Sequence, residues 1–87
     1  MSGFEFSIYP NPVHVQARIS IDLPTAEEVQ VDVLDIRGVL LESIWSGELT
    51  AGNTDLTWRP DLADGVYFIR IRSEQGQEVR KIVHQRF

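Results

Sequence analysis

The feature that most constrains the fold of this chain is a hydrophobic period of two residues. Between residues 13 and 23, apolar and polar side chains alternate almost without interruption. Alternate side chains share one face in a β-strand, whereas a helix scatters them around its axis. We therefore predict one long strand over 13–23, with an apolar face. Shorter runs of the same period predict further strands at 4–8, 29–33, 56–58 and 67–71.

Residues that favour turns separate these runs at short intervals. They lie at 10–12, 24–28, 35–38, 51–53, 61–65 and 73–76. Short strands at this spacing predict an all-β fold, an immunoglobulin-like antiparallel β-sandwich of about seven strands. Thr25 to Glu28 has the spacing of a helix capping box, but strict alternation follows it. We predict a turn there, with at most one helical turn.

Three local patterns predict specific turn geometry. Asp35 is placed to open a turn, and Gly38 to adopt a positive φ near its end. Gly52 marks a further turn. The segment from Leu62 to Tyr67 resembles a tyrosine corner, in which the tyrosine hydroxyl bonds the backbone of the preceding loop.

Length and composition exclude several classes of protein. The chain has 87 residues, 43% of them hydrophobic and 24% charged, and no cysteine. We interpret residues 1–3 as an added start and 4–87 as a single domain, which is too small for both a thick core and a deep cleft. The lack of cysteine excludes disulfides, thiol catalysis and zinc–thiolate sites.

The remaining chemical groups do not form a catalytic pattern. His14 and His84 are the only histidines, and both read as solvated strand residues. We predict no catalytic residue, cofactor or metal site. Calcium is an open alternative, with Asp61 and Asp64 as the best ligands, while Asp32 and Asp35 read as turn residues. Because the chain is acidic overall, with a net charge of −5, nucleic acid is not an expected partner.

A second functional hypothesis is a module that binds carbohydrate, and a third is a passive spacer. Stacking on sugars needs exposed aromatic rings. Trp58 and Tyr67 occupy the same alternating positions as the core residues of their strands, so we expect them to be buried. Trp45 is therefore the best candidate for an exposed ring.

Charge is divided unevenly along the chain. Residues 1–68 carry three basic and eleven acidic side chains, and residues 69–87 carry five basic and two acidic ones, a net charge of −8 against +3. Such asymmetry draws attention to the last strands as a functional region. An exposed pair of arginine-rich strands is the alternative interpretation.

Several motifs, in order, resemble one known family. Residues 8–12 carry Tyr9, Pro10, Asn11 and Pro12, and resemble the opening of the C-terminal sorting domains of the type IX secretion system (type A, Por secretion system) of Bacteroidetes-type bacteria. Each proline fixes its own φ, so this segment is a stiff border with a preceding domain. Later matches lie at 31–38, 49–52, 56–58, 62–71 and 76–83, so the resemblance covers residues 6 to 87.

The resemblance implies a sorting function rather than catalysis. It implies an N-terminal cargo domain, and recognition by the outer-membrane translocon, its shuttle protein and a sortase-like transpeptidase. The protein would cross the periplasm and reach the cell surface or the medium, and we expect a monomer. The resemblance places the sorting signal in the last strands, at Gly65, Tyr67, Gly76, Arg80, Lys81, Ile82 and Val83.

These residues also have plain structural interpretations. Gly65 and Gly76 suit turns, and Tyr67, Ile82 and Val83 suit core packing. Lys81, the only lysine in the chain, is the sharpest test because it is a charge in an aliphatic strand. We expect the last strand to lie at or near a sheet edge, where a partner recognises it by strand addition or by its tail.

Overall fold

A computed structural model describes residues 5–86, which form seven strands and no helix. The expectations for residues 1–3 and for Phe4 lie outside this range. No helix in the described range has the length and apolar character needed to span a membrane. The strands are β1 (Glu5–Tyr9), β2 (Ala17–Leu23), β3 (Glu27–Leu34), β4 (Leu40–Leu49), β5 (Gly52–Trp58), β6 (Gly65–Ser73) and β7 (Gly76–His84).

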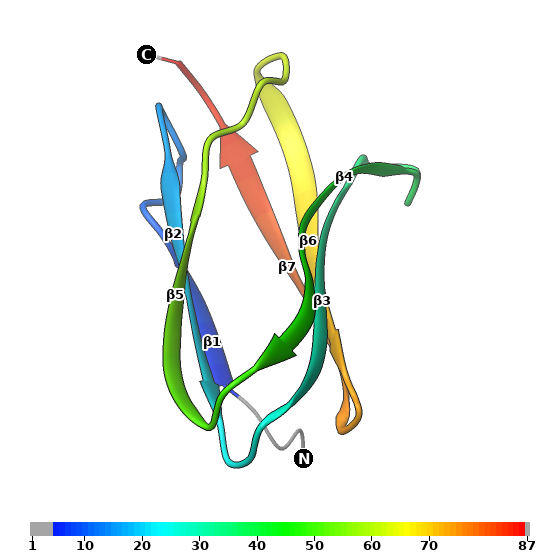
Figure 1. The fold of residues 1–87 in the computed structure, drawn as a ribbon. Helices are drawn as coiled ribbons and strands as arrows, with labels where there is room; N and C mark the ends of the chain where they lie inside the picture. The colour runs from blue at the N-terminus through cyan, green and yellow to red at the C-terminus, as the bar shows by residue number, and fades with distance from the viewer. Residues whose placement is uncertain (1–4, 87) are drawn as a thin grey trace.

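The strands form two facing antiparallel sheets (Figure 1). One sheet has the order β1-β2-β5, and the other has the order β4-β3-β6-β7. This confirms the predicted all-β sandwich of about seven strands. In antibody constant domains the fourth strand joins the sheet of the first two, whereas here β4 pairs with β3. As expected, the last strand, β7, lies at a sheet edge.

Alternation builds the core between the sheets. Every second residue of β2 is buried, and the central positions of β3 and β6 meet them from the other sheet. Trp58 is buried, as predicted, and its indole N–H donates to Glu42 Oε1 at 3.0 Å, a bond that joins the two sheets. The fully buried members include Val13, Ile19, Ile21, Val31, Val33, Ile69 and Ile71.

The predicted long strand over residues 13–23 is wrong in its first part. β2 begins only at Ala17, and Val15 is 77% exposed. Val13 is buried, but it makes an isolated parallel bridge with His84 of β7 instead of joining β2. Alternation continues through residues 13–16 because Val13 has a buried site of its own, so the pattern alone does not show where the strand begins.

The sequence pattern gave no specific prediction for β4. Its pairing with β3 contains two register shifts, between Val31 and Asp32 and between Val33 and Leu34. Such irregularities interrupt the two-residue period on the bulged strand. The sequence of β4 therefore lacks the regular alternation that predicts the other strands. Glu27 and Glu28 already belong to β3, so the segment from Thr25 makes no helical turn.

The predicted local turns are confirmed. The hydroxyl of Tyr67 donates to the backbone carbonyl of Ala63, which is the bond of a tyrosine corner. Asp35 Oδ1 accepts the backbone N–H groups of Arg37 at 2.8 Å and Val39 at 3.0 Å. Gly38 closes this turn with a φ of 83°. Gly52, with a φ of 95°, is the first residue of β5. The connection from β4 to β5 lies at the end of the sandwich opposite the β3–β4 turn (Figure 1).

Candidate functional site

The β6–β7 hairpin brings most of the predicted sorting residues together. In its register Tyr67 lies opposite Ile82, and Gly65 lies opposite His84. Gly65 stands close to the tyrosine ring, since a Cβ on it would lie 3.8 Å from Cε2 of Tyr67. Arg80, Lys81, Ile82 and Val83 follow one another in the second half of β7. One end of this hairpin therefore gathers six of the seven residues.

These six residues divide between the inside and the surface. Ile82 is 1% exposed and belongs to the core, and the ring of Tyr67 packs against that core. Lys81 points away from it and is exposed. The guanidinium of Arg80 lies over the ring of Phe6 on β1, 4.4 Å from its centroid, and so bridges the two sheets at their open side.

Gly76 lies apart from the others, at the turn of the hairpin. It pairs with Ser73, and it lies five positions before Lys81 along the strand, a distance of about 17 Å. Buried Glu27 holds this turn: its carboxylate accepts the N–H of Glu74 at 3.1 Å and the side-chain amide of Gln75 at 2.7 Å. The position of Gly76 supports a role in turn geometry.

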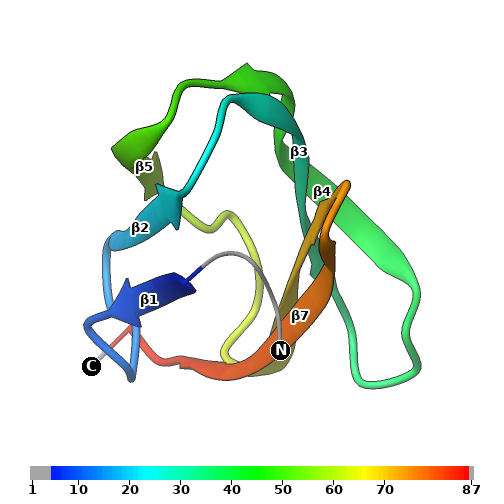
Figure 2. The same cartoon turned by 90° about the horizontal axis from the view of Figure 1, so that it is seen from below.

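The Tyr-Pro-Asn-Pro segment lies against the outer edge of β7. The side-chain oxygen of Asn11 accepts the backbone N–H of Val83 at 3.1 Å, and its amide donates to the carbonyl of Lys81 at 3.4 Å. Both X-Pro bonds of the segment are cis. Figure 2 shows this loop, after β1, beside the end of β7. The segment that resembles the family's opening thus contacts the predicted sorting strand.

Val13 extends this contact. Its N–H donates to the carbonyl of Val83 at 2.7 Å, and its carbonyl accepts the N–H of Gln85 at 2.9 Å. We call Asn11 and Val13 the clasp. Because Lys81, Val83 and Gln85 bond the clasp through their outward backbone groups, the end of the edge strand is paired on both sides.

Further bonds hold the residues around the clasp. His84 is 2% exposed, and its Nδ1 donates to the carbonyl of Val13 at 3.2 Å. The interpretation of His84 as a solvated residue is therefore wrong, because its ring is buried and bonds the backbone of the clasp. His14 bonds the carbonyl of Gln85, and the N–H of Arg86 donates to Asp64 Oδ1 at 3.3 Å.

The basic charge of the last two strands is partly neutralised. Asp32 was predicted at a turn, but it lies within β3, has no exposed surface and accepts from Arg70 at 2.9 Å and Arg72 at 3.3 Å. The Gln30 amide also donates to both of its oxygens at 3.2 Å. Burial of a carboxylate is tolerated because these donors satisfy it. Lys81 takes part in none of the ion pairs among residues 5–86.

Asp35 is a carboxylate whose ionised form is favoured by the hydrogen bonds that it accepts. The N–H of Val39 is the main cause that lowers the pKa of this carboxyl below its ordinary value of 3.8. Hydrogen bonds and charge from Arg37, whose guanidinium lies 3.0 Å away, act in the same direction. This ionised carboxylate holds the β3–β4 turn in shape.

The residues proposed for other functions are occupied in the fold. The indole N–H of Trp45 donates to the carbonyl of Gly47 at 3.1 Å, and its half-buried ring packs against the core. It is therefore not a free platform for a sugar. Among residues 5–86, no three acidic or histidine side chains gather where they could hold a metal ion.

Sequence reasoning missed Val13 and Glu27. Val13 fitted the alternating pattern of the next strand, so its separate role could not be distinguished. Glu27 carried a signal, the capping-box spacing, but it caps the turn of a distant hairpin rather than a helix.

The comparison with known families agrees with this geometry. The model of the family described as "Secretion system C-terminal sorting domain" matches residues 7–85. The match begins just before the Tyr-Pro-Asn-Pro segment and includes both the clasp and the β6–β7 hairpin. No curated protein matches the sequence.

Proposed function

The chain belongs to the secretion system C-terminal sorting domain family, and we propose that its β6–β7 hairpin is the surface by which the type IX machinery recognises it. Domains of this family direct a cargo protein through the type IX system to the cell surface or the medium. The family is non-catalytic, and we extend that to this chain.

One observation carries the choice of surface. Asn11 and Val13 tie the Tyr-Pro-Asn-Pro segment to the backbone of residues 81–85, so the family's opening motif and the last strand form one surface. The segment is not the border with a preceding domain, because β1 comes before it and pairs with β2. A partner that binds this end of the sandwich meets the opening motif and most of the sorting residues together, and this supports the outer-membrane translocon, its shuttle protein and a transpeptidase as partners.

Exposure decides which residues a partner can read directly. Lys81 and Arg80 are exposed, whereas Ile82 is buried and supports the strand from within. We assign Lys81 to recognition, and Ile82 and Tyr67 to the shape of the hairpin. Transit through the periplasm as a folded monomer belongs to the same proposal.

Export of a reporter tests the function. A reporter with an N-terminal secretion signal is fused ahead of the 87-residue chain and expressed in a type IX-competent bacterium and in a strain that lacks the translocon. The reporter is expected in the medium or on the surface of the first strain only. Equal release from both strains would contradict the function, and so would periplasmic retention in both.

A carbohydrate-binding role has no specific support in the fold, since the ring of Trp45 is engaged in packing.

A further inference from the structure

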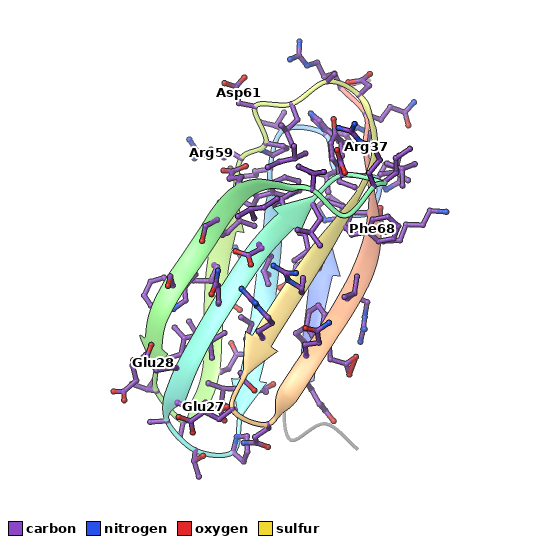
Figure 3. All side chains as sticks on the ribbon, turned by 90° about the vertical axis from the view of Figure 1, so that its right-hand side faces the viewer. Glu27, Glu28, Arg37, Arg59, Asp61 and Phe68 are labelled. Atoms are coloured by element: carbon purple, nitrogen blue, oxygen red, sulfur yellow. The ribbon has the colours of Figure 1, made fainter. Side chains whose placement is uncertain are left out.

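The outer face of the four-stranded sheet carries an unusual row of side chains. The register places Leu40 opposite Leu34, Leu34 opposite Phe68, and Phe68 opposite Lys81, so the row crosses all four strands. Directly opposed side chains in antiparallel sheets have Cβ atoms about 5 Å apart. We call Leu40, Leu34, Phe68 and Lys81 the apolar row. Figure 3 shows Phe68 on this side of the molecule, near the loop that carries Arg37.

This composition differs from that of the neighbouring row. One step along the strands, the same face carries Ser43, Asp32, Arg70 and Val79, of which three are polar or charged and Val79 is apolar and 43% exposed. Leu40 is 52% exposed, and Val66, beside Phe68 on β6, is 37% exposed. Leu34, between Leu40 and Phe68, is only 8% exposed, so the exposed apolar surface of this face lies at Leu40 and around Val66. Exposed apolar side chains that gather on one face are a feature of interaction sites.

Charge indicates what kind of partner fits the row. Arg70 and Arg72 share the buried carboxylate of Asp32, so their charge is compensated. Lys81 is exposed at the end of the row and joins none of the ion pairs among residues 5–86. A matching partner presents apolar side chains to Leu40 and Phe68, and a carboxylate to Lys81.

We infer that the apolar row is a docking surface for a protein of the type IX machinery, which reads β3 and β4 together with the last strand. The inference rests on the proposed function, because the row is continuous with the recognition hairpin through Lys81. It adds residues that the sorting motif does not contain. In this account the machinery recognises a face of the folded sheet rather than a linear tail.

Two substitutions at exposed positions test the row. Leu40→Ser and Val66→Ser remove apolar contact without emptying the core, and Val15→Ser is a matched control because Val15 is 77% exposed outside the row. Each variant is made in the reporter fusion, and its thermal unfolding is measured on the purified chain. We expect export to fall about tenfold for Leu40→Ser, in the row, and for Val66→Ser, beside it, as for an interface residue worth about 1.4 kcal/mol. Export of Val15→Ser should match the unaltered chain.

The outcomes separate this inference from the function on which it rests. If the unaltered chain is exported and folded Leu40→Ser and Val66→Ser are exported equally well, the row is not a docking surface. An equal loss in Val15→Ser would also overturn the inference, because the effect would not be local. Failure of the unaltered chain to be exported would contradict the proposed function itself.

Discussion

The side-chain oxygen of Asn11 accepts the backbone N–H of Val83 at 3.1 Å, although the two residues lie 72 positions apart. Unpaired groups on an edge strand invite pairing with other chains, and proteins commonly cover them. Here the segment that follows β1 covers the outer edge of β7 at its end. Inside the two sheets, by contrast, each strand is hydrogen-bonded to another strand. The sorting strand is therefore ordered by residues at the other end of the sequence.

Removal of the Asn11 side chain should loosen this strand end. We expect Asn11→Ala to lower the free energy of local opening at Val83 by about 1 kcal/mol, the usual contribution of such a bond. Hydrogen exchange of the Val83 amide measures it. Asn11→Asp keeps the acceptor for Val83 and loses the donor to Lys81, so it should retain more protection. Unchanged exchange in Asn11→Ala would show that the clasp does not hold the strand.

The buried Asp32 should matter more for stability than an exposed carboxylate. Asp32→Ala removes the shared partner of Arg70 and Arg72, whose side chains are partly exposed, and we expect it to lower the free energy of unfolding by about 1.5–3 kcal/mol. Asp55 provides a control, because its ion pair with Arg18 is exposed and 4.0 Å long. Asp55→Ala should cost no more than about 1 kcal/mol. Equal losses in denaturant unfolding would contradict the assignment.

Asp35 predicts a dependence of stability on pH. Its folded pKa lies below the ordinary 3.8, mainly because of the Val39 N–H and also because of Arg37. A lowered folded pKa stabilises the fold above the ordinary value, and this contribution is lost as the pH falls through the folded pKa. Asp35→Asn should therefore lose less stability than the unaltered chain below about pH 4. Chemical unfolding from pH 7 to pH 2 compares the two, and parallel curves would refute the prediction.

The tyrosine corner should contribute to stability through a single hydroxyl. Tyr67→Phe removes the bond to the Ala63 carbonyl and keeps the ring, so we expect a loss of about 1 kcal/mol in thermal unfolding. Tyr9, which is 47% exposed, gives the control Tyr9→Phe, expected to leave stability unchanged. If both variants unfold at the temperature of the unaltered chain, the corner is not a stabilising device.

Much of the fold was predictable because a buried sheet face imposes a two-residue period on the sequence. Ile19, Ile21, Ile69 and Ile71 show this directly, and all four are buried. The period does not reveal β4, whose register shifts break it. It also assigns Val13 to the wrong element, since a buried valine looks the same whether it joins β2 or bridges to β7.

The candidate site was predictable in its residues but not in its geometry. The resemblance singled out both Asn11 and Lys81, and the distance between them in sequence gave no sign that they touch. Contacts over such a separation depend on the order of strands in the sheets, which no local pattern determines. The apolar row has the same origin, because Leu40 and Lys81 lie on opposite edge strands of one sheet.

If the type IX machinery reads the exposed surface of the last strand, a change at Lys81 should disrupt recognition and leave the domain folded. Truncation of the strand is a poor test because it would remove Ile82 from the core. Lys81→Glu changes only an exposed side chain, and Arg59→Glu is the same reversal on another exposed residue. Both should keep the stability of the unaltered chain within about 0.5 kcal/mol.

The decisive measurement is the amount of reporter exported by fusions to the unaltered chain, to Lys81→Glu and to Arg59→Glu. We expect a fall of about tenfold for Lys81→Glu, as for the loss of an interface charge worth about 1.4 kcal/mol, and no change for Arg59→Glu. Export of folded Lys81→Glu at the level of the unaltered chain would contradict recognition through Lys81.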